Sequence, residues 1–127
     1  MRAARNFLVA IGACGAVLAA AAALPASGAR AGDPARVQIV EKEFSLTLSR
    51  LRVHSGQAIV QLVNFGMDNH DLVIQANTKG TKPLRFAQLS PGDHSTKTVK
   101  LARGHYTLWC SLPQHRKLGM VATIVVT

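Results

Sequence analysis

Several residue types are scarce in this chain, and each shortage excludes a class of protein. Of 127 residues only two are cysteine and 5% are aromatic, and 6 acidic residues face 15 Lys and Arg, for a net charge of +9. Two cysteines cannot build the disulfide framework of a small secreted scaffold. The few aromatics do not alternate with basic residues, which argues against binding nucleic acid. The acidic residues are scattered, with no carboxylate pair for acid–base catalysis, so we expect no enzyme activity.

A convincing helical period is also missing after residue 32, which argues against a helical bundle. Short segments with apolar alternation take its place, separated by turn residues at intervals of about 8–12. The segment 82–89 is expected to form one or two helical turns at most. The segments expected as strands are 37–40, 44–48, 51–53, 57–63, 70–75, 95–101, 106–110 and 120–126. The length and pattern predict one all-β domain, a sandwich or barrel of about seven or eight strands.

The N-terminal segment differs from the rest in composition. Residues 6–29 carry no charge, Arg2 and Arg5 precede them, and 16 of the 18 residues at 7–24 are apolar. A basic start, an apolar stretch and small residues after it are typical of a secretory signal peptide. We therefore assign residues 1–31 to a signal peptide or an N-terminal anchor.

Three fates of this leader are open. Small residues at 27–29 or 29–31 suit cleavage by a signal peptidase, which we favour. Alternatively the stretch stays as an anchor, since 18 residues approach the length of a membrane span, or a lipid is attached at Cys14. Each fate exports the domain, so we expect a periplasmic or other extracytoplasmic location, with membrane contact only through a retained or lipidated N-terminus. The remaining domain, 32–127, has 12 basic and 6 acidic residues, about +6.

Three potential metal ligands lie close together near the C-terminus. Cys110, the only cysteine left after the leader, is followed by His115 and Met120 with four residues between successive members. Sulfur donors beside an imidazole suit copper, and in part zinc. A trigonal site needs a second imidazole, and His70 is the best candidate because it begins a strand after a glycine-containing loop. Singly these residues are more often structural, but together they favour a metal site.

The chain resembles the cupredoxins, the type 1 (blue) copper proteins of the plastocyanin and azurin group, over nearly all of 36–127. The segments that carry the resemblance are Asn64, His70-Asp71, Pro91-Gly92, 104–110, Pro113-x-His115 and Gly119-Met120. It implies a Greek-key β-sandwich with one mononuclear copper, bound by His70, Cys110 and His115 with Met120 as a weak axial ligand. It also implies single-electron transfer between redox partners through Cu(I) and Cu(II), with His115 as the exposed exit.

Two further side chains acquire roles from the resemblance. Where the family usually has Asn after the first His, this chain has Asp71, which we expect to accept a hydrogen bond from Ser111 and to favour Cu(II) by its charge. The hydroxyl of Tyr106 is expected to bond a nearby backbone group at the sandwich corner.

The rim of the expected copper loop combines charge with apolar surface. Arg116 and Lys117 lie beside the apolar Leu112, Pro113 and Leu118. Such a patch suits brief docking of a monomer on an acidic redox partner. The other histidines are expected to be solvated, Trp109 to pack on the outside of the sheet rather than to carry electrons, and Met67 either to line the copper mouth or to be exposed.

Two other functions remain open at this stage. In the first, the protein is an extracytoplasmic copper-binding protein for delivery, buffering or resistance, using His and Met donors such as Met67 and the spare histidines. In the second, the sandwich holds zinc or no metal and serves adhesion. A thiolate-to-copper absorption band that depends on Cys110 separates electron transfer from both.

Overall fold

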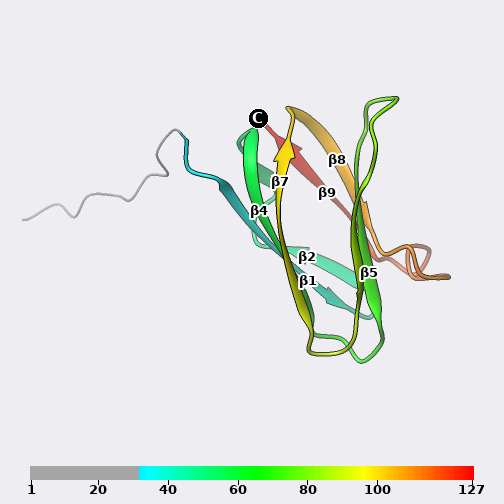
Figure 1. Ribbon diagram of the computed structural model, residues 1–127. Coiled ribbons are helices and arrows are strands. Elements are labelled where there is room, and N and C mark those ends of the chain that lie inside the picture. The colour runs from blue at the N-terminus through cyan, green and yellow to red at the C-terminus, as the bar shows by residue number, and fades with distance from the viewer. Residues whose placement is uncertain (1–31) are drawn as a thin grey trace, which may run out of the picture.

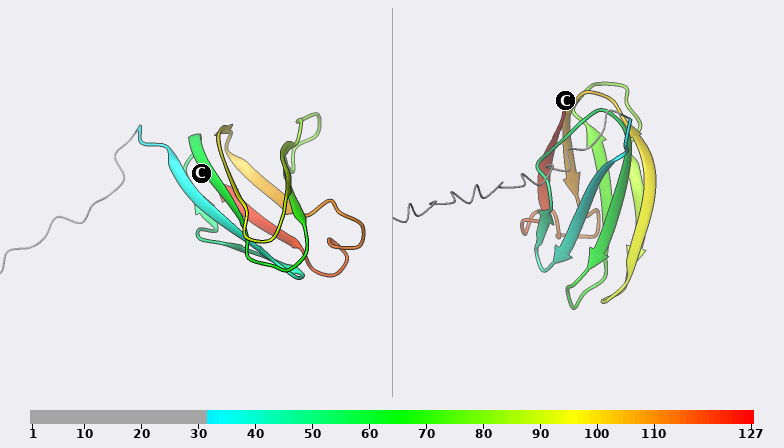
Figure 2. Two further views of the ribbon diagram at one scale, coloured as in Figure 1. Left: turned by 60° about the horizontal axis from the view of Figure 1, so that its bottom comes forward. Right: turned by 90° about the vertical axis from the view of Figure 1, so that its left-hand side faces the viewer.

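The computed structural model describes residues 32–127, so the expected leader at 1–31 and Cys14 lie outside the described residues. Within them the chain forms nine strands and two sheets that pack face to face (Figures 1 and 2). The strands are β1 Ala35–Lys42, β2 Ser45–Leu48, β3 Arg52–Val53, β4 Gly56–Asn64, β5 His70–Ala76, β6 Leu84–Leu89, β7 His94–Leu101, β8 Gly104–Trp109 and β9 Val121–Val126. None of the described residues belongs to a helix long and apolar enough to cross a membrane.

The strand order shows a mixed sandwich. One sheet runs β2-β1-β4-β7 and the other β3-β9-β8-β5-β6. Most neighbours are antiparallel, but β1 pairs with β4, and β3 with β9, in parallel. The prediction of an all-β sandwich is confirmed, with nine strands instead of about seven or eight.

Alternating side chains explain why these segments become strands. In β1 the residues Ala35, Val37 and Ile39 are buried while Arg36 and Gln38 are exposed, which is the period of two of a half-buried strand. The inward faces of both sheets meet in one apolar core, where Ile39, Leu62, Leu72 and Leu108 are almost completely buried. Burying each of these side chains contributes about 1.5–3 kcal/mol, which fixes the two sheets against each other.

The expectation of helical turns at 82–89 is wrong, because this segment contains β6. Phe86 and Leu89 are buried at a spacing of three, which a helix face would also give. The pairing with β5 explains the spacing: Phe86 lies opposite Leu72 and Leu89 opposite His70, so β6 carries one residue more than β5. The extra residue of this β-bulge therefore produces a spacing of three between buried residues, which one turn of helix would also produce.

The expected tyrosine contact is present at the turn before β8. The hydroxyl of Tyr106 donates a hydrogen bond of 2.9 Å to the backbone oxygen of Ala102, and the ring is buried against the core. This contact fastens the connection from β7 to β8 at the end of the sandwich opposite to the last residue of β8.

Candidate metal centre

Sheet pairing brings together the two residues that sequence places 40 positions apart. Strands β5 and β8 are antiparallel neighbours in which Val73 lies opposite Trp109. The start of one strand must therefore lie beside the end of the other, and His70 begins β5 while Cys110 follows β8. Both side chains are 0% exposed.

The loop from Cys110 to Met120 folds back on itself. The backbone N–H of Cys110 donates to the oxygen of Met120, and the N–H of Met120 donates to the oxygen of His115, both at 3.1 Å. Gln114 and Gly119 have φ values of 69° and 121°, so two left-handed positions allow the reversal. The loop thus brings the His115 ring to the Cys110 thiol, and Met120 is completely buried.

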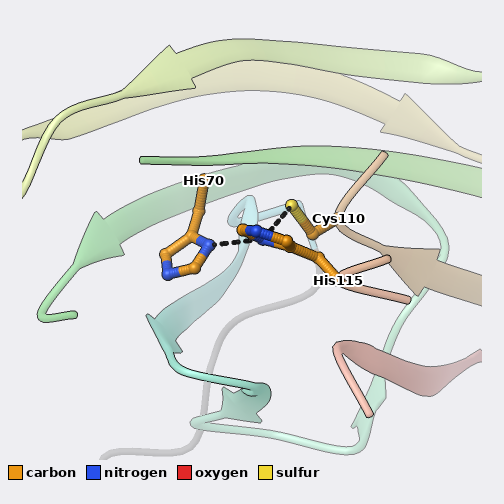
Figure 3. A group of neighbouring side chains, drawn as sticks. All are labelled: His70, Cys110 and His115. Carbon is orange, nitrogen blue, oxygen red and sulfur yellow. Dashed lines mark hydrogen bonds between the residues drawn. The ribbon is translucent and has the colours of Figure 1, made fainter. Parts of the chain in front are cut away.

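Three donor atoms, from His70, Cys110 and His115, converge as Figure 3 shows, and we call this site the pocket. The Nδ1 atoms of His70 and His115 lie 3.1 Å apart, and Cys110 Sγ lies 3.4 Å from His115 Nδ1. All three lie within 4.8 Å of one another. Among residues 32–127 no other group of at least three His, Cys or acidic residues has this geometry. A thiol with two imidazole nitrogens matches the donor preference of copper, and the buried Met120 ends the same loop.

Burial changes the acidity of the thiol. Desolvation raises the pKa of Cys110, and hydrogen bonds from the backbone of Asp71 and Leu112 oppose the rise. The thiol therefore keeps its proton at neutral pH when no metal is bound. A metal ion that binds here has to displace that proton, which links metal affinity to pH.

The side chain of Asp71 makes the contact that the sequence predicted. Its two carboxylate oxygens accept hydrogen bonds from the backbone N–H and from the hydroxyl of Ser111. Because Asp71 follows His70 and Ser111 follows Cys110, these bonds join the strand end that carries the imidazole to the loop that carries the thiol.

Asn64 organises the loop that precedes His70. Its side chain is completely buried, and its Nδ2 donates to the backbone oxygens of Asp68 at 2.8 Å and Leu89 at 3.1 Å. Its Oδ1 accepts from the N–H of Gly66 at 2.8 Å. All the polar atoms of this amide are satisfied by the backbone, so the residue fixes loop 65–69 rather than offering a donor to a metal.

Glu43 is a site residue that sequence reasoning missed. Its Oε1 accepts hydrogen bonds from the backbone N–H of Met67 at 2.7 Å and of Asp68 at 2.8 Å, and lies 3.0 Å from Nε2 of His70. These hydrogen bonds, that of Asp68 first, lower the pKa of Glu43 to about 2. In sequence it lies between two expected strands, 27 positions from His70, and no local pattern marks it.

The surface around His115 is partly apolar. His115 is half-buried, with its ring edge-on to Phe44 at a centroid distance of 5.0 Å. Leu118 is 57% exposed, and Lys117 is exposed beside it. Arg116 lies with its guanidinium carbon 4.4 Å from the centre of the Trp109 ring, a cation–π contact that the sequence did not predict.

The remaining candidates are not members of the group of three converging donors. Met67 is 86% exposed in the loop that precedes His70. His54, His94 and His105 are exposed, as expected, and Trp109 is half-buried on its strand.

Comparisons with solved structures agree with this fold. Structures with the same fold include a reduced auracyanin from the photosynthetic bacterium Roseiflexus castenholzii (TM-score 0.61, 20% identity, 76% of this chain and 99% of that chain). Auracyanin A, a blue copper protein from Chloroflexus aurantiacus, gives a TM-score of 0.60 at 13% identity, covering 75% of this chain and 100% of that one. A copper-containing nitrite reductase from Thermus scotoductus matches at 0.51 and 23% identity, with 80% of this chain but 24% of the reductase covered.

A comparison with curated protein sequences found no significant match. The family comparison is decisive, because residues 35–127 match the copper-binding proteins of the plastocyanin/azurin family. This span includes both sheets and every donor atom of the pocket. The chain is therefore a member of the plastocyanin/azurin family of copper-binding proteins, and its cofactor is copper.

Proposed function

We propose that the protein is an exported electron carrier in which His70, Cys110, His115 and Met120 bind one copper ion. The observation that carries this proposal is the convergence of two imidazole nitrogens and one thiol within 4.8 Å of one another. Copper, when bound, supplies a one-electron couple between Cu(I) and Cu(II). Two histidines, a cysteine and a weak methionine form the donor set associated with blue-copper electron transfer.

Rigidity of the protein supports this function. His70 is held at the start of β5, Cys110 directly follows β8, and the loop between Cys110 and Met120 is closed by backbone hydrogen bonds. The hydrogen bond from Ser111 to Asp71 joins the start of β5 to the loop that begins at Cys110. Donor atoms that are fixed before the metal arrives need little movement when the charge of the metal changes, which favours fast electron exchange.

In this proposal, electrons leave the copper site through His115. This imidazole is half-buried and borders the exposed Leu118, whereas His70 is completely buried. A partner that packs on this apolar rim approaches the site most closely at His115. The exposed Lys117 and the chain's excess of basic residues suit a partner with an acidic docking surface, since complementary charge raises the rate of encounter.

The proposal extends to location and assembly. The apolar, uncharged segment at 6–29 supports export, and we propose a periplasmic or other extracytoplasmic monomer. We propose an electron carrier without enzyme activity, because the scattered acidic residues offer no carboxylate pair for acid–base catalysis. Mass spectrometry of the native N-terminus distinguishes cleavage, lipidation at Cys14 and retention.

Voltammetry of the copper-loaded protein tests electron transfer against copper handling. We expect a reversible one-electron wave whose shape is maintained at high scan rates. An irreversible response, or copper released on reduction, would support delivery or buffering instead. The exposed Met67 and the dispersed His54, His94 and His105 would be the additional donors in that case.

A further inference from the structure

The carboxylate of Glu43 occupies an unusual position for a residue at a turn. It lies between β1 and β2, on the opposite sheet from His70, and yet it reaches the outer nitrogen of that buried imidazole at 3.0 Å. The Glu43 side chain is 27% exposed, whereas the His70 side chain is 0% exposed. The pair therefore joins the surface to a completely buried donor of the pocket.

We propose that Glu43 is a positioning residue for copper: its carboxylate holds His70 as the Nε2–H tautomer, with Nδ1 directed to Cys110 and His115, and favours Cu(II) over Cu(I). This inference rests on the proposed function, in which His70 binds copper. It assigns to this chain a carboxylate–histidine pair that neither the ligand spacing nor the family match specifies.

The tautomer follows from the partners of the two ring nitrogens. A neutral imidazole has one N–H donor and one nitrogen with a free lone pair. Nε2 faces an ionised carboxylate, which only accepts hydrogen bonds, so the hydrogen belongs on Nε2. Nδ1 then keeps its lone pair, and this is the nitrogen that lies 3.1 Å from His115 Nδ1 within the donor cluster. The imidazole is in the metal-binding form before any metal arrives.

The electrostatic effect follows from the same contact. A carboxylate that accepts a hydrogen bond from one ring nitrogen makes the other nitrogen a more basic ligand. The more highly charged ion gains more from such a ligand, and from the negative charge itself. Since His70 is completely buried, this interaction is screened less than one between surface groups. Glu43 should therefore stabilise Cu(II) more than Cu(I).

The surrounding loop fits closely around this carboxylate. One oxygen, Oε1, accepts from the N–H groups of Met67 and Asp68 as well as facing His70. A Cβ added at Gly66 would overlap the Glu43 carboxyl group, lying 2.8 Å from its Cδ. The glycine thus makes room for the carboxylate. Three converging N–H groups and a cleared space distinguish this arrangement from a chance surface ion pair.

Two substitutions of Glu43 and one charge-matched control test the proposal in the full chain. Glu43→Gln removes the charge but keeps an acceptor, and Glu43→Ala removes both. Asp68→Asn removes one negative charge from the exposed side chain of a residue in the same loop and leaves its backbone bond to Glu43 in place. The measurements are Cu(II) and Cu(I) affinities by competition, the midpoint potential, and the ¹⁵N chemical shifts of His70 in metal-free protein.

We expect both Glu43 variants to lose about 10–100-fold in Cu(II) affinity. The loss for Cu(I) should be smaller, and each tenfold difference between the two losses corresponds to a rise of about 59 mV in potential. Asp68→Asn should match the wild type in both affinities. Metal-free wild type should show His70 with its proton on Nε2, and Glu43→Ala should show a mixture of tautomers.

Three results would overturn the proposal: His70 protonated on Nδ1 in the metal-free wild type, unchanged potentials in both Glu43 variants, or an equal shift in Asp68→Asn. The nitrogen shifts of the wild type decide the matter even when Glu43→Ala fails to fold. They also separate the two proposals. A copper complex that survives replacement of Cys110 contradicts electron transfer. The tautomer of His70 is measured without copper and tests only the role of Glu43.

Discussion

The carboxylate of Asp71 accepts two hydrogen bonds from Ser111, one from its backbone N–H and one from its hydroxyl. These residues are 40 positions apart, and each directly follows a proposed copper-binding residue. The bonds therefore set the separation between the His70 and Cys110 backbones. They also hold the negative charge of Asp71, the neighbour of His70, against Ser111, the neighbour of Cys110.

Replacing Asp71 with Asn should raise the midpoint potential. The amide keeps the size and an acceptor oxygen but removes the charge that favours Cu(II). Equilibrium redox titration measures the effect, and Ser111→Ala is the matched control, because it removes the hydroxyl bond and keeps the charge. A fall in potential in Asp71→Asn would contradict the assigned role.

Glu41 should make the protein less stable as the pH rises through neutrality. Its side chain is completely buried, and neither carboxyl oxygen has a hydrogen-bond partner among the described residues. Burial, with the negative charge of Asp71 adding to it, raises the pKa of Glu41 from 4.5 to about 8. Between pH 4.5 and about pH 8, Glu41 therefore keeps its proton in the folded state but loses it in the unfolded chain. The stability that depends on this proton is fully present below about pH 4.5 and is lost as the pH rises to about 8.

Glu41→Gln provides the test of this pH dependence. One pKa unit corresponds to about 1.4 kcal/mol, so the wild type should lose a few kcal/mol of unfolding free energy across the window. The variant should lose much less, because the amide does not ionise. Urea unfolding of metal-free protein at several pH values measures both. If the unfolding free energy fell equally with pH in both proteins, another group would be responsible. Glu43 is not that group, because its pKa is lowered to about 2 and it titrates below this window.

Tyr106→Phe should destabilise the protein without affecting the pocket. The substitution removes the hydrogen bond to the Ala102 carbonyl and leaves the ring in the core. A net loss of about 0.5–1.5 kcal/mol is expected from chemical unfolding. The midpoint potential should be unchanged, since the contact lies at the far end of β8 from Cys110. A changed potential would mean that the corner is coupled to the metal site.

Electron exchange with an acidic redox protein should slow as ionic strength rises. Lys117 is exposed in the loop that carries His115, so Lys117→Glu should lower the association rate and weaken its dependence on salt. Lys79→Glu is the matched control, because this exposed lysine follows the opposite end of β5 from His70. Stopped-flow kinetics measures the rates. A wild-type rate that does not change with salt would rule out electrostatic steering at this rim.

The strands and the donors of the C-terminal loop were predictable because their causes are local. Alternating apolar residues in β1 produce one buried face, and the spacing of Cys110, His115 and Met120 is written in a single loop. The helical expectation at 82–89 failed since a bulge in β6 produced a spacing of three. A short segment cannot show whether that spacing belongs to a helix or to an irregular strand.

The support of the pocket was only partly predictable. Asp71 and Ser111 each neighbour a recognised donor, so their contact could be expected from the sequence. Glu43 has no such neighbour, and its contact with His70 exists only because the two sheets bring the turn after β1 to the start of β5. The packing of Arg116 on Trp109 likewise depends on how the loop folds over the sheet.

The visible spectrum of the protein reconstituted with Cu(II), recorded beside that of Cys110→Ser, tests most directly whether Cys110 binds copper in an electron-transfer site. We expect an intense blue or green band from thiolate-to-copper charge transfer, and its complete loss in Cys110→Ser. A pale or colourless complex that survives the substitution would contradict electron transfer through this pocket.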